Sequence, residues 1–104
     1  MTIRIDITPR AEQQGRRARE WWRENRSAAP KLFEQEFADV VRLLAEQPDA
    51  GHCFPRPRFP EMRRLLMLKT RYLVFYEFQP HKSRVLILAI WSAVRGRLPY
   101  MSRK

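Results

Sequence analysis

A chain of 104 residues in which 44% are hydrophobic is long enough for one domain with a hydrophobic core, and too short for two. Its formal charge of +10 at pH 7 is unevenly distributed. Residues 1–50 carry nine Lys/Arg and nine Asp/Glu, whereas residues 51–104 carry twelve Lys/Arg and only two acids, Glu61 and Glu77. The hydrophobic content excludes a disordered chain, and the uneven charge predicts a basic surface that attracts polyanions or acidic protein segments.

The sequence also argues against a membrane protein, a disulfide-bonded protein and a metalloprotein. No apolar run approaches the roughly 20 residues that cross a bilayer, and residues 3–7 alternate instead of forming the apolar run of a signal peptide. We therefore expect a cytoplasmic protein. The single cysteine, Cys53, rules out an internal disulfide. His52 precedes it, but a tetrahedral metal site needs about four ligands and only His81 remains, so we expect no metal and no cofactor.

The chain opens with a predicted strand followed by a predicted helix. Residues 3–7 alternate isoleucine with Arg and Asp, which indicates a half-buried strand. Thr8 is the expected N-cap of a helix that begins at Pro9 and runs to about Asn25, because threonine accepts backbone bonds there and proline is tolerated in the first turn. The small and apolar positions of this helix recur at helical spacing, at Ala11, Gly15, Ala18 and Trp22. They form a narrow face that suits close packing.

A second helix follows a short break. Ser27 is its expected N-cap, with Pro30 in its first turn. Its apolar residues give the clearest helical period in the chain, at Phe33, Phe37, Val40 and Leu44. It ends before Pro48, and Gly51 supplies the turn that follows. Two antiparallel helices joined by a short link predict a helical hairpin.

The second half of the chain has the pattern of a sheet. Pro55, Pro57 and Pro60 predict a rigid extended loop, because proline has no N–H to donate to a ladder. Beyond this loop, three apolar runs separated by turn-like residues predict an antiparallel meander of three strands. These runs cover residues 63–68, 71–78 and 84–91. A short basic tail follows from Gly96 onward.

The order of these elements predicts an α+β fold in one domain over residues 1–104. We expect the N-terminal strand and the three-stranded meander to form one sheet packed against the helical hairpin. The first strand should pair with one of the three later strands, since an isolated strand would leave its backbone N–H and C=O groups without partners.

Several side chains of the second half are candidates for a site. Five arginines lie in or beside the predicted sheet, which fits either a solvated basic face or a binding surface: Arg63, Arg64, Arg71, Arg95 and Arg97. Tyr72 and Tyr76 share one face of a strand, where core packing is the default and stacking or catalysis the alternative. Trp91 is expected to fill the core against the helical hairpin.

The order and spacing of these segments resemble the RelE/ParE toxins of bacterial type II toxin–antitoxin systems. The segments that carry the resemblance are the opening strand, residues 43–51 (LLAEQPDAG), Arg63-Arg64-Leu65, residues 72–76 (YLVFY), residues 85–91 (VLILAIW) and Arg95-Gly96. The similarity covers nearly the whole chain. It implies a RelE/ParE-like fold and a toxin, linked to plasmid stabilization, that is held inactive by a cognate antitoxin whose acidic or amphipathic C-terminal segment wraps it.

The resemblance implies one of two activities. The RelE-like branch of the family cleaves messenger RNA on the ribosome, using Lys, Arg and often Tyr or His side chains. The ParE-like branch is thought to lack that chemistry and to inhibit DNA gyrase. In both branches the toxin contacts DNA only indirectly, through its complex with the antitoxin.

Individual positions favour the ParE-like branch. Cleavage by a 2′-hydroxyl needs a base, cations for the phosphate and an acid for the leaving oxygen. Leu66 and Leu73 fall where nuclease members usually place Lys or Arg, and Ser92 stands where the family often has His. Arg64 and Arg95 do match basic family positions, but two arginines are not a catalytic set.

The resemblance and the basic face together predict a gyrase-inhibiting toxin that acts by binding, with no catalytic residue assigned. The expected partner-binding residues are Arg63, Arg64, Arg71, Trp91, Arg95 and Arg97. The first alternative is a ribosome-dependent mRNA endoribonuclease, for which the catalytic candidates are Arg64, Arg71, Tyr76 and Arg95. The second alternative is a small basic nucleic-acid-binding module without toxicity.

Overall fold

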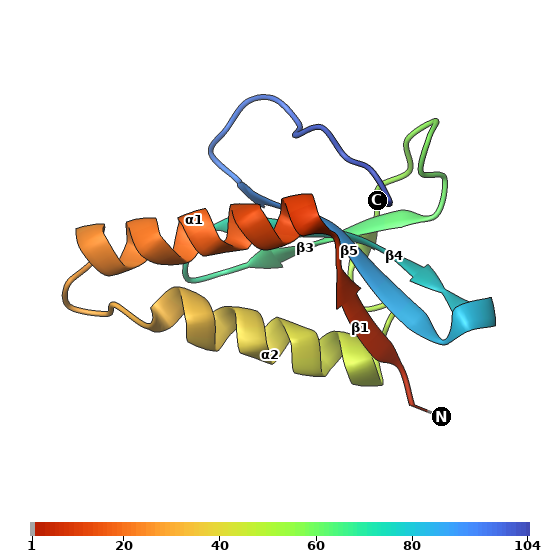
Figure 1. Ribbon diagram of the computed structural model, residues 1–104, viewed down its shortest axis with the longest axis horizontal. Helices are drawn as coiled ribbons and strands as arrows, with labels where there is room; N and C mark the ends of the chain where they lie inside the picture. Colours follow the sequence, from red (N-terminus) through yellow and green to blue (C-terminus); the bar gives the residue numbers. More distant parts are fainter. Residues whose placement is uncertain (1) are drawn as a thin grey trace.

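Two helices lie across one face of a five-stranded sheet (Figure 1). The computed structural model describes residues 2–104. Its elements, in chain order, are β1 (Arg4–Ile7), α1 (Pro9–Asn25), α2 (Leu32–Glu46), β2 (His52–Cys53), β3 (Met62–Met67), β4 (Tyr72–Gln79), the 3-10 turn η1 (Pro80–Lys82) and β5 (Arg84–Ser92). The predicted α+β class and the helical hairpin are confirmed.

The sheet has the order β1-β5-β4-β3-β2. The meander β3–β4–β5 is antiparallel as predicted, and β1 joins it by pairing in parallel with β5. One strand was not predicted. His52 and Cys53 form β2, which pairs antiparallel with β3 through Arg64 and Arg63. A strand of two residues is too short to show any periodicity in sequence.

Both helix starts depend on local hydrogen bonds. The Thr8 side chain accepts from the backbone N–H of Ala11 at 3.2 Å, so this predicted N-cap is confirmed, with proline in the first turn. The predicted cap of α2 is wrong, because Lys31 occupies the N-cap position without a side-chain bond and Ser27 lies in the preceding turn. The chain enters α2 through backbone turns instead, in which the Leu32 N–H donates to the Ala29 carbonyl at 3.2 Å.

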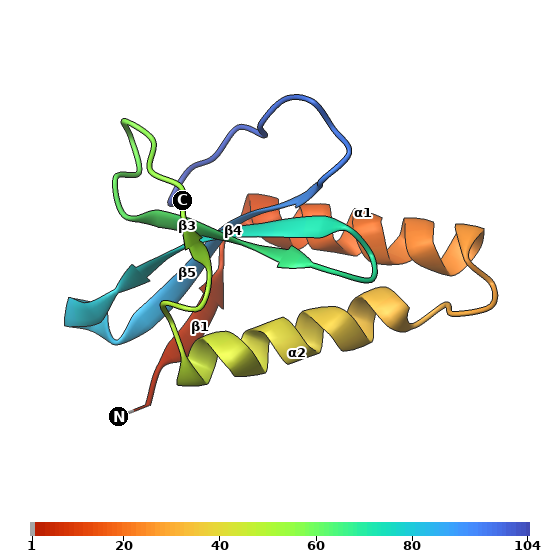
Figure 2. The ribbon, with the colours of Figure 1, turned by 180° about the vertical axis from the view of Figure 1, so that it is seen from behind.

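The sheet has an apolar cluster on each face. The helix-side core joins both helices to one face of the sheet and includes Leu44, Val74, Tyr76 and Ile87. The second-face cluster, on the opposite face, consists of Phe59, Met62, Phe75, Leu86, Leu88, Ala89 and Met101. Trp91 packs against the second-face cluster, so its predicted place against the hairpin is wrong. The C-terminal segment, residues 96–104, is the dark blue end of the chain in Figures 1 and 2 and supplies Met101 to this cluster. Its last residues also lie near the start of α1, where Ser102 and Lys104 line a cavity with Pro9 and Arg10.

A β-bulge explains why Trp91 packs against the second-face cluster and not in the helix-side core. Phe75 pairs with Ala89 whereas Tyr76 pairs with Ile87, so the register shifts by one residue along β5. Leu88 and Ala89 consequently both belong to the second-face cluster, and the residues after them exchange faces. The backbone N–H of Ile90 donates to the Gln14 side chain at 2.8 Å, which ties the end of β5 to α1.

The backbone of Gly51 lies very close to Arg64 of β3 and Tyr76 of β4. A Cβ atom there would lie 2.8 Å from the Arg64 carbonyl oxygen and 2.8 Å from the Tyr76 hydroxyl oxygen. Its backbone N–H donates to that hydroxyl at 2.8 Å, and Tyr76 is fully buried. Arg63 donates to the Gly51 carbonyl at 2.7 Å. The turn between α2 and β2 is therefore fixed to the sheet from both sides.

We expect Gly51→Ala to lower the free energy of unfolding by about 1–3 kcal/mol, because the added methyl group must displace backbone and a buried ring. Gly96→Ala is the matched control, since a Cβ at Gly96 meets nothing within 4 Å. The control should change stability by no more than about 0.5 kcal/mol. Urea unfolding of the unmodified protein and the two variants measures both changes. Equal unfolding midpoints for the two variants would contradict the claim that there is no room for a side chain at Gly51.

Candidate partner-binding groove

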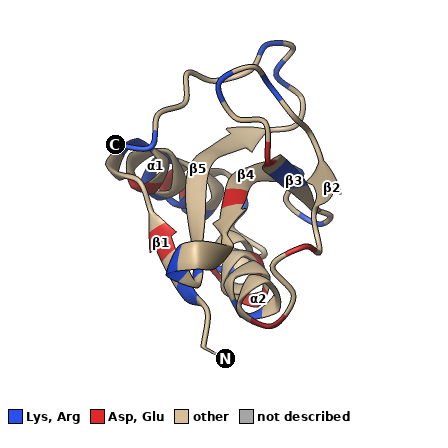
Figure 3. Ribbon diagram, turned by 90° about the vertical axis from the view of Figure 1, so that its right-hand side faces the viewer, with Lys and Arg blue, Asp and Glu red and all other residues tan. Residues whose placement is uncertain are grey.

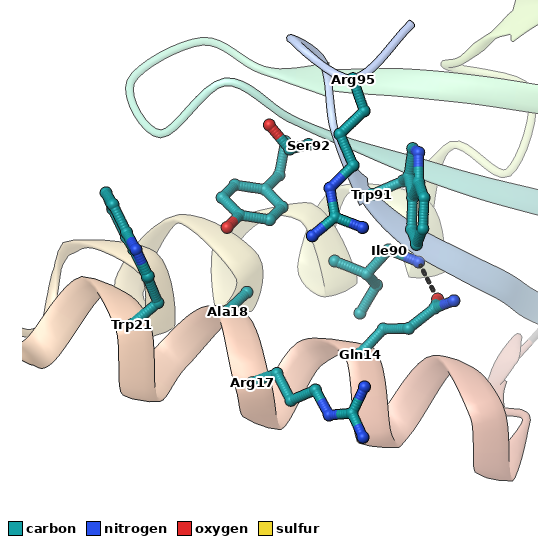
Figure 4. A pocket seen from close by; sticks show the side chains of 9 residues that line it. Gln14, Arg17, Ala18, Trp21, Ile90, Trp91, Ser92 and Arg95 are labelled. Carbon is teal, nitrogen blue, oxygen red and sulfur yellow. Dashed lines mark hydrogen bonds between the residues drawn. The ribbon is translucent and has the colours of Figure 1, made fainter. Parts of the chain in front are cut away.

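A groove runs between α1 and the strand ends where β5 leaves the sheet. It consists of two adjoining cavities of about 210 and 560 Å³ that share Trp21, Tyr72, Ser92 and Arg95. We call it the Arg95 groove. Its lining residues are Gln14, Arg17, Ala18, Trp21, Trp22, Arg26, Lys69, Thr70, Arg71, Tyr72, Ile90, Trp91, Ser92, Val94 and Arg95. Figure 4 shows the smaller cavity, into which Arg95 extends from the segment after β5.

Arg95 is held in place by Trp91. Its guanidinium lies over the Trp91 ring at 4.2 Å from the ring centre, a cation–π arrangement. The Trp91 indole N–H donates to the Arg97 carbonyl at 2.8 Å, which fixes the ring. A backbone bond of 3.2 Å from the Arg95 N–H to the Ser92 carbonyl closes the turn that carries this arginine. The guanidinium is thus presented to the groove by a tight turn.

The β3–β4 turn supplies the other wall of the groove. Arg71 has a φ of 65°, the left-handed conformation that lets the chain reverse. The turn is anchored from α2, because the Glu36 carboxylate accepts from the N–H groups of Lys69 at 2.7 Å and Thr70 at 2.9 Å, and from the Thr70 hydroxyl at 2.7 Å. The Ala93 N–H donates to the Arg71 carbonyl at 2.8 Å and joins this turn to the end of β5.

Helix α1 contributes aromatic and basic side chains. Trp22 packs on the helix-side core and its indole N–H donates to the Ala29 carbonyl at 2.9 Å. Trp21 points to the groove and is 44% exposed. The Arg26 guanidinium lies 5.0 Å from the Trp21 ring centre. Arg17, one helical turn before Trp21, lines the smaller cavity with it.

The groove is strongly cationic. Its lining includes five basic side chains, those of Arg17, Arg26, Lys69, Arg71 and Arg95, and no Asp, Glu or His among residues 2–104. Burial raises the pKa of the Tyr72 hydroxyl, and the nearby Arg95 charge only partly opposes this shift. The hydroxyl therefore stays protonated near neutral pH. Such a surface suits an anionic partner, and it has no group that titrates near pH 7 to move a proton.

The six predicted partner-binding residues do not form one surface. Arg71, Trp91 and Arg95 meet in the groove. Arg63 lies outside the groove, where its guanidinium donates hydrogen bonds to the carbonyls of Asp49 at 3.2 Å and Gly51 at 2.7 Å.

The other two predicted arginines also lie away from the groove. Arg64 stacks on Phe54 at 4.1 Å, on the sheet face opposite the helices. Arg97 is exposed in the C-terminal segment, where its carbonyl accepts the Trp91 bond. The groove therefore holds three of the six residues.

The proposed proton-transfer residue of the nuclease alternative is not accessible. Tyr76 is 0% exposed and its hydroxyl accepts the Gly51 bond. Burial raises its pKa more than this bond and the Arg63 charge lower it. The Tyr76 hydroxyl is therefore enclosed in the helix-side core and bonded to Gly51, away from solvent.

The two leucines that stand at usual Lys/Arg positions face each other. Leu66 and Leu73 are direct cross-strand partners in β3 and β4. They line a separate cavity of about 570 Å³ together with Arg64 and His52. The sheet surface is therefore apolar at this point.

Sequence reasoning missed the groove residues of α1. Arg17 and Trp21 are four residues apart and therefore share a helix face, which is a signal the sequence does contain. Their contact with Tyr72 and Ser92 comes from how α1 packs on the sheet, which periodicity does not give. Within residues 2–104, no cluster of three or more His, Cys, Asp or Glu side chains could hold a metal. No helix in that range is long and apolar enough to cross a membrane.

Comparisons with known proteins agree with this architecture. Residues 5–96 match the profile of the ParE toxin of the type II toxin–antitoxin system parDE. No curated protein sequence matches the chain. Two solved structures of the E. coli toxin RelE are similar in fold. A free-state mutant with two Arg-to-Ala substitutions is 20% identical with a TM-score of 0.52, covering 90% of this chain and 86% of that one.

The isolated RelE toxin in a second crystal form is 21% identical with a TM-score of 0.51, covering 90% of this chain and 87% of that one. Identity this low supports the shared fold alone. The profile match spans most of the chain, including both helices and all five strands apart from the first residue of β1. The chain belongs to the ParE toxin family and is a RelE/ParE-type toxin of a type II toxin–antitoxin system.

Proposed function

We propose that this toxin inhibits DNA gyrase by binding it, without chemistry of its own, and that an acidic or amphipathic segment of the cognate antitoxin keeps it inactive. The observation that carries the proposal is the composition of the Arg95 groove. It presents five cations beside the exposed ring of Trp21 and the half-buried rings of Trp91 and Tyr72, but no side chain that titrates near neutral pH. Cations and rings give affinity for an anionic partner, whereas RNA cleavage also needs proton transfer.

The site favours a partner with carboxylates and apolar side chains. Arginine pairs carboxylates through two parallel bonds, and Trp21 and Trp91 offer ring surface on either side of Arg95. Twelve Lys/Arg against two acids in residues 51–104 would speed the encounter through long-range attraction. An antitoxin segment with both features fits this groove.

A ribosome-dependent mRNA endoribonuclease is the second candidate. Two observations favour it: the solved structures that resemble this chain are RelE toxins, and Arg71, Arg95 and the Tyr72 hydroxyl meet in one groove. Against it stand the burial of Tyr76 and the Leu66–Leu73 pair. A small nucleic-acid-binding module is the third candidate, and the cationic groove is its only support.

Induction of the toxin alone separates these candidates. We expect purified toxin to inhibit the supercoiling activity of gyrase on plasmid DNA, because the proposed action is binding to that enzyme. Primer extension on cellular messages from the same induced cells should show no ordered cuts at codon boundaries. Ordered cuts with unaffected supercoiling would overturn the gyrase proposal in favour of the nuclease, and neither effect with salt-sensitive binding to naked nucleic acid would favour the third candidate.

Arg95→Gln should weaken binding of the cognate antitoxin about tenfold, since an interfacial charge pair is worth about 1.5 kcal/mol or more. Arg42→Gln is the matched control. It removes the same charge from an exposed arginine of α2 that pairs only with Asp39 on the surface. Calorimetric titration of the antitoxin into each protein measures the change. Equal losses in the two variants would mean that net charge, and not the groove, determines affinity.

A further inference from the structure

The C-terminal segment, residues 96–104, is fastened to the sheet by side chains. Within residues 2–104, no backbone-to-backbone hydrogen bond joins this segment to the rest of the fold. Met101, which is 7% exposed, is buried in the second-face cluster, and Pro99 is buried as well. Arg103 remains exposed but binds Glu77. A segment held in this way opens at low cost compared with a strand or helix, because no ladder has to break.

Arg103 occupies a site built to hold a guanidinium. It binds both carboxylate oxygens of Glu77, from Nε at 2.6 Å and from Nη2 at 3.0 Å. Nη2 also donates to the Arg58 carbonyl at 3.2 Å, and the guanidinium lies 4.7 Å from the centre of the Phe59 ring. One edge and one face of the guanidinium are therefore recognised, by two carboxylate bonds, a carbonyl and an aromatic ring.

Glu77 stands out among the groups around it. It is the acidic residue of β4 (red in Figure 3), and the nearby loop before β3 carries Arg56 and Arg58. Its side chain is 6% exposed. Burial raises the pKa of this carboxyl, but the bonds from Arg103 and Gln79 outweigh burial and hold the pKa below its ordinary value. When the tail leaves, a buried carboxylate loses its main cation, so whatever replaces the tail must bring another.

We propose that Glu77, Phe59 and the Arg58 carbonyl form a docking site for an extended segment of a partner protein that carries an apolar residue two positions before an arginine. The chain's own Met101-Ser102-Arg103 already fills this site in that manner, with the methionine in the second-face cluster and the arginine on Glu77. The C-terminal segment of the same chain thus occupies the site and blocks it. This inference concerns the opposite sheet face from the helices and does not depend on gyrase or on the antitoxin.

Two physical effects limit which segments can bind at this site. The net charge of +10 repels cationic peptides in general, so any binding of an arginine-bearing segment must come from the local site. The short tether gives the chain's own tail an effective concentration in the millimolar range, which lowers the apparent affinity for a partner until the tail is weakened. The site is therefore selective and closed at rest.

The test uses a fluorescent peptide with the sequence of residues 97–104 (RLPYMSRK) and the full-length protein. Fluorescence polarization compares the unmodified chain with the double variant Met101→Ala/Arg103→Ala, in which Glu77 and Phe59 are intact. We expect the double variant to bind the peptide at least about tenfold more tightly, because its own tail no longer competes. The same peptide with Arg103→Ala should bind the double variant at least about tenfold more weakly, through loss of the charge-assisted bonds.

Each other outcome overturns the proposal. Equal binding of the two peptides by the double variant would show that the Glu77 fork recognises nothing. Equal binding by the double variant and the unmodified chain would show that the tail does not close the site. Absence of saturable binding to a folded double variant at millimolar peptide would show that there is no docking site. If circular dichroism shows the double variant to be unfolded, the single variant Arg103→Ala provides the same comparisons.

Discussion

The fold depends on one contact at the centre of the sheet, the hydrogen bond between the Tyr76 hydroxyl and the Gly51 N–H at 2.8 Å. Tyr76 lies in β4 and packs in the helix-side core, while Gly51 lies just after α2 and just before β2. Because there is no room for a Cβ at Gly51, the chain passes directly over the ring. Arg63 holds the same glycine through its carbonyl. These bonds fix where α2 ends and let β2 begin its pairing with β3.

The same contact shapes the function. Because Tyr76 is buried in the helix-side core, its hydroxyl cannot reach a substrate to give or take a proton. What the toxin exposes instead is the Arg95 groove, with guanidinium groups held by Trp91 and by the turn at Arg71. Rigid cations and aromatic rings are the features of a binding surface. This surface supports the proposed action of the toxin by binding.

Local signals in the sequence predicted what local physics determines. The helical period from Phe33 to Leu44, the Thr8 cap and the alternating runs after Pro60 each gave an element that the structure has. Features set by distant contacts were missed. The strand β2 is two residues long and exists only because β3 is beside it.

The bulge in β5 likewise depends on distant packing, and it places Trp91 against the second-face cluster and not in the helix-side core. Simple alternation cannot show such an exchange of faces. The candidate site was predicted in part for the same reason. Arg71, Trp91 and Arg95 were identified, whereas Arg17 and Trp21 required knowledge of how α1 packs on the sheet.

The most direct test of the role of Tyr76 is the variant Tyr76→Phe, assayed for stability by urea unfolding and for toxicity per folded molecule. The account predicts a loss of about 1–3 kcal/mol in the free energy of unfolding, since the buried Gly51 N–H loses its acceptor, with toxicity retained. Unchanged stability together with abolished toxicity would contradict it and make Tyr76 a catalytic group.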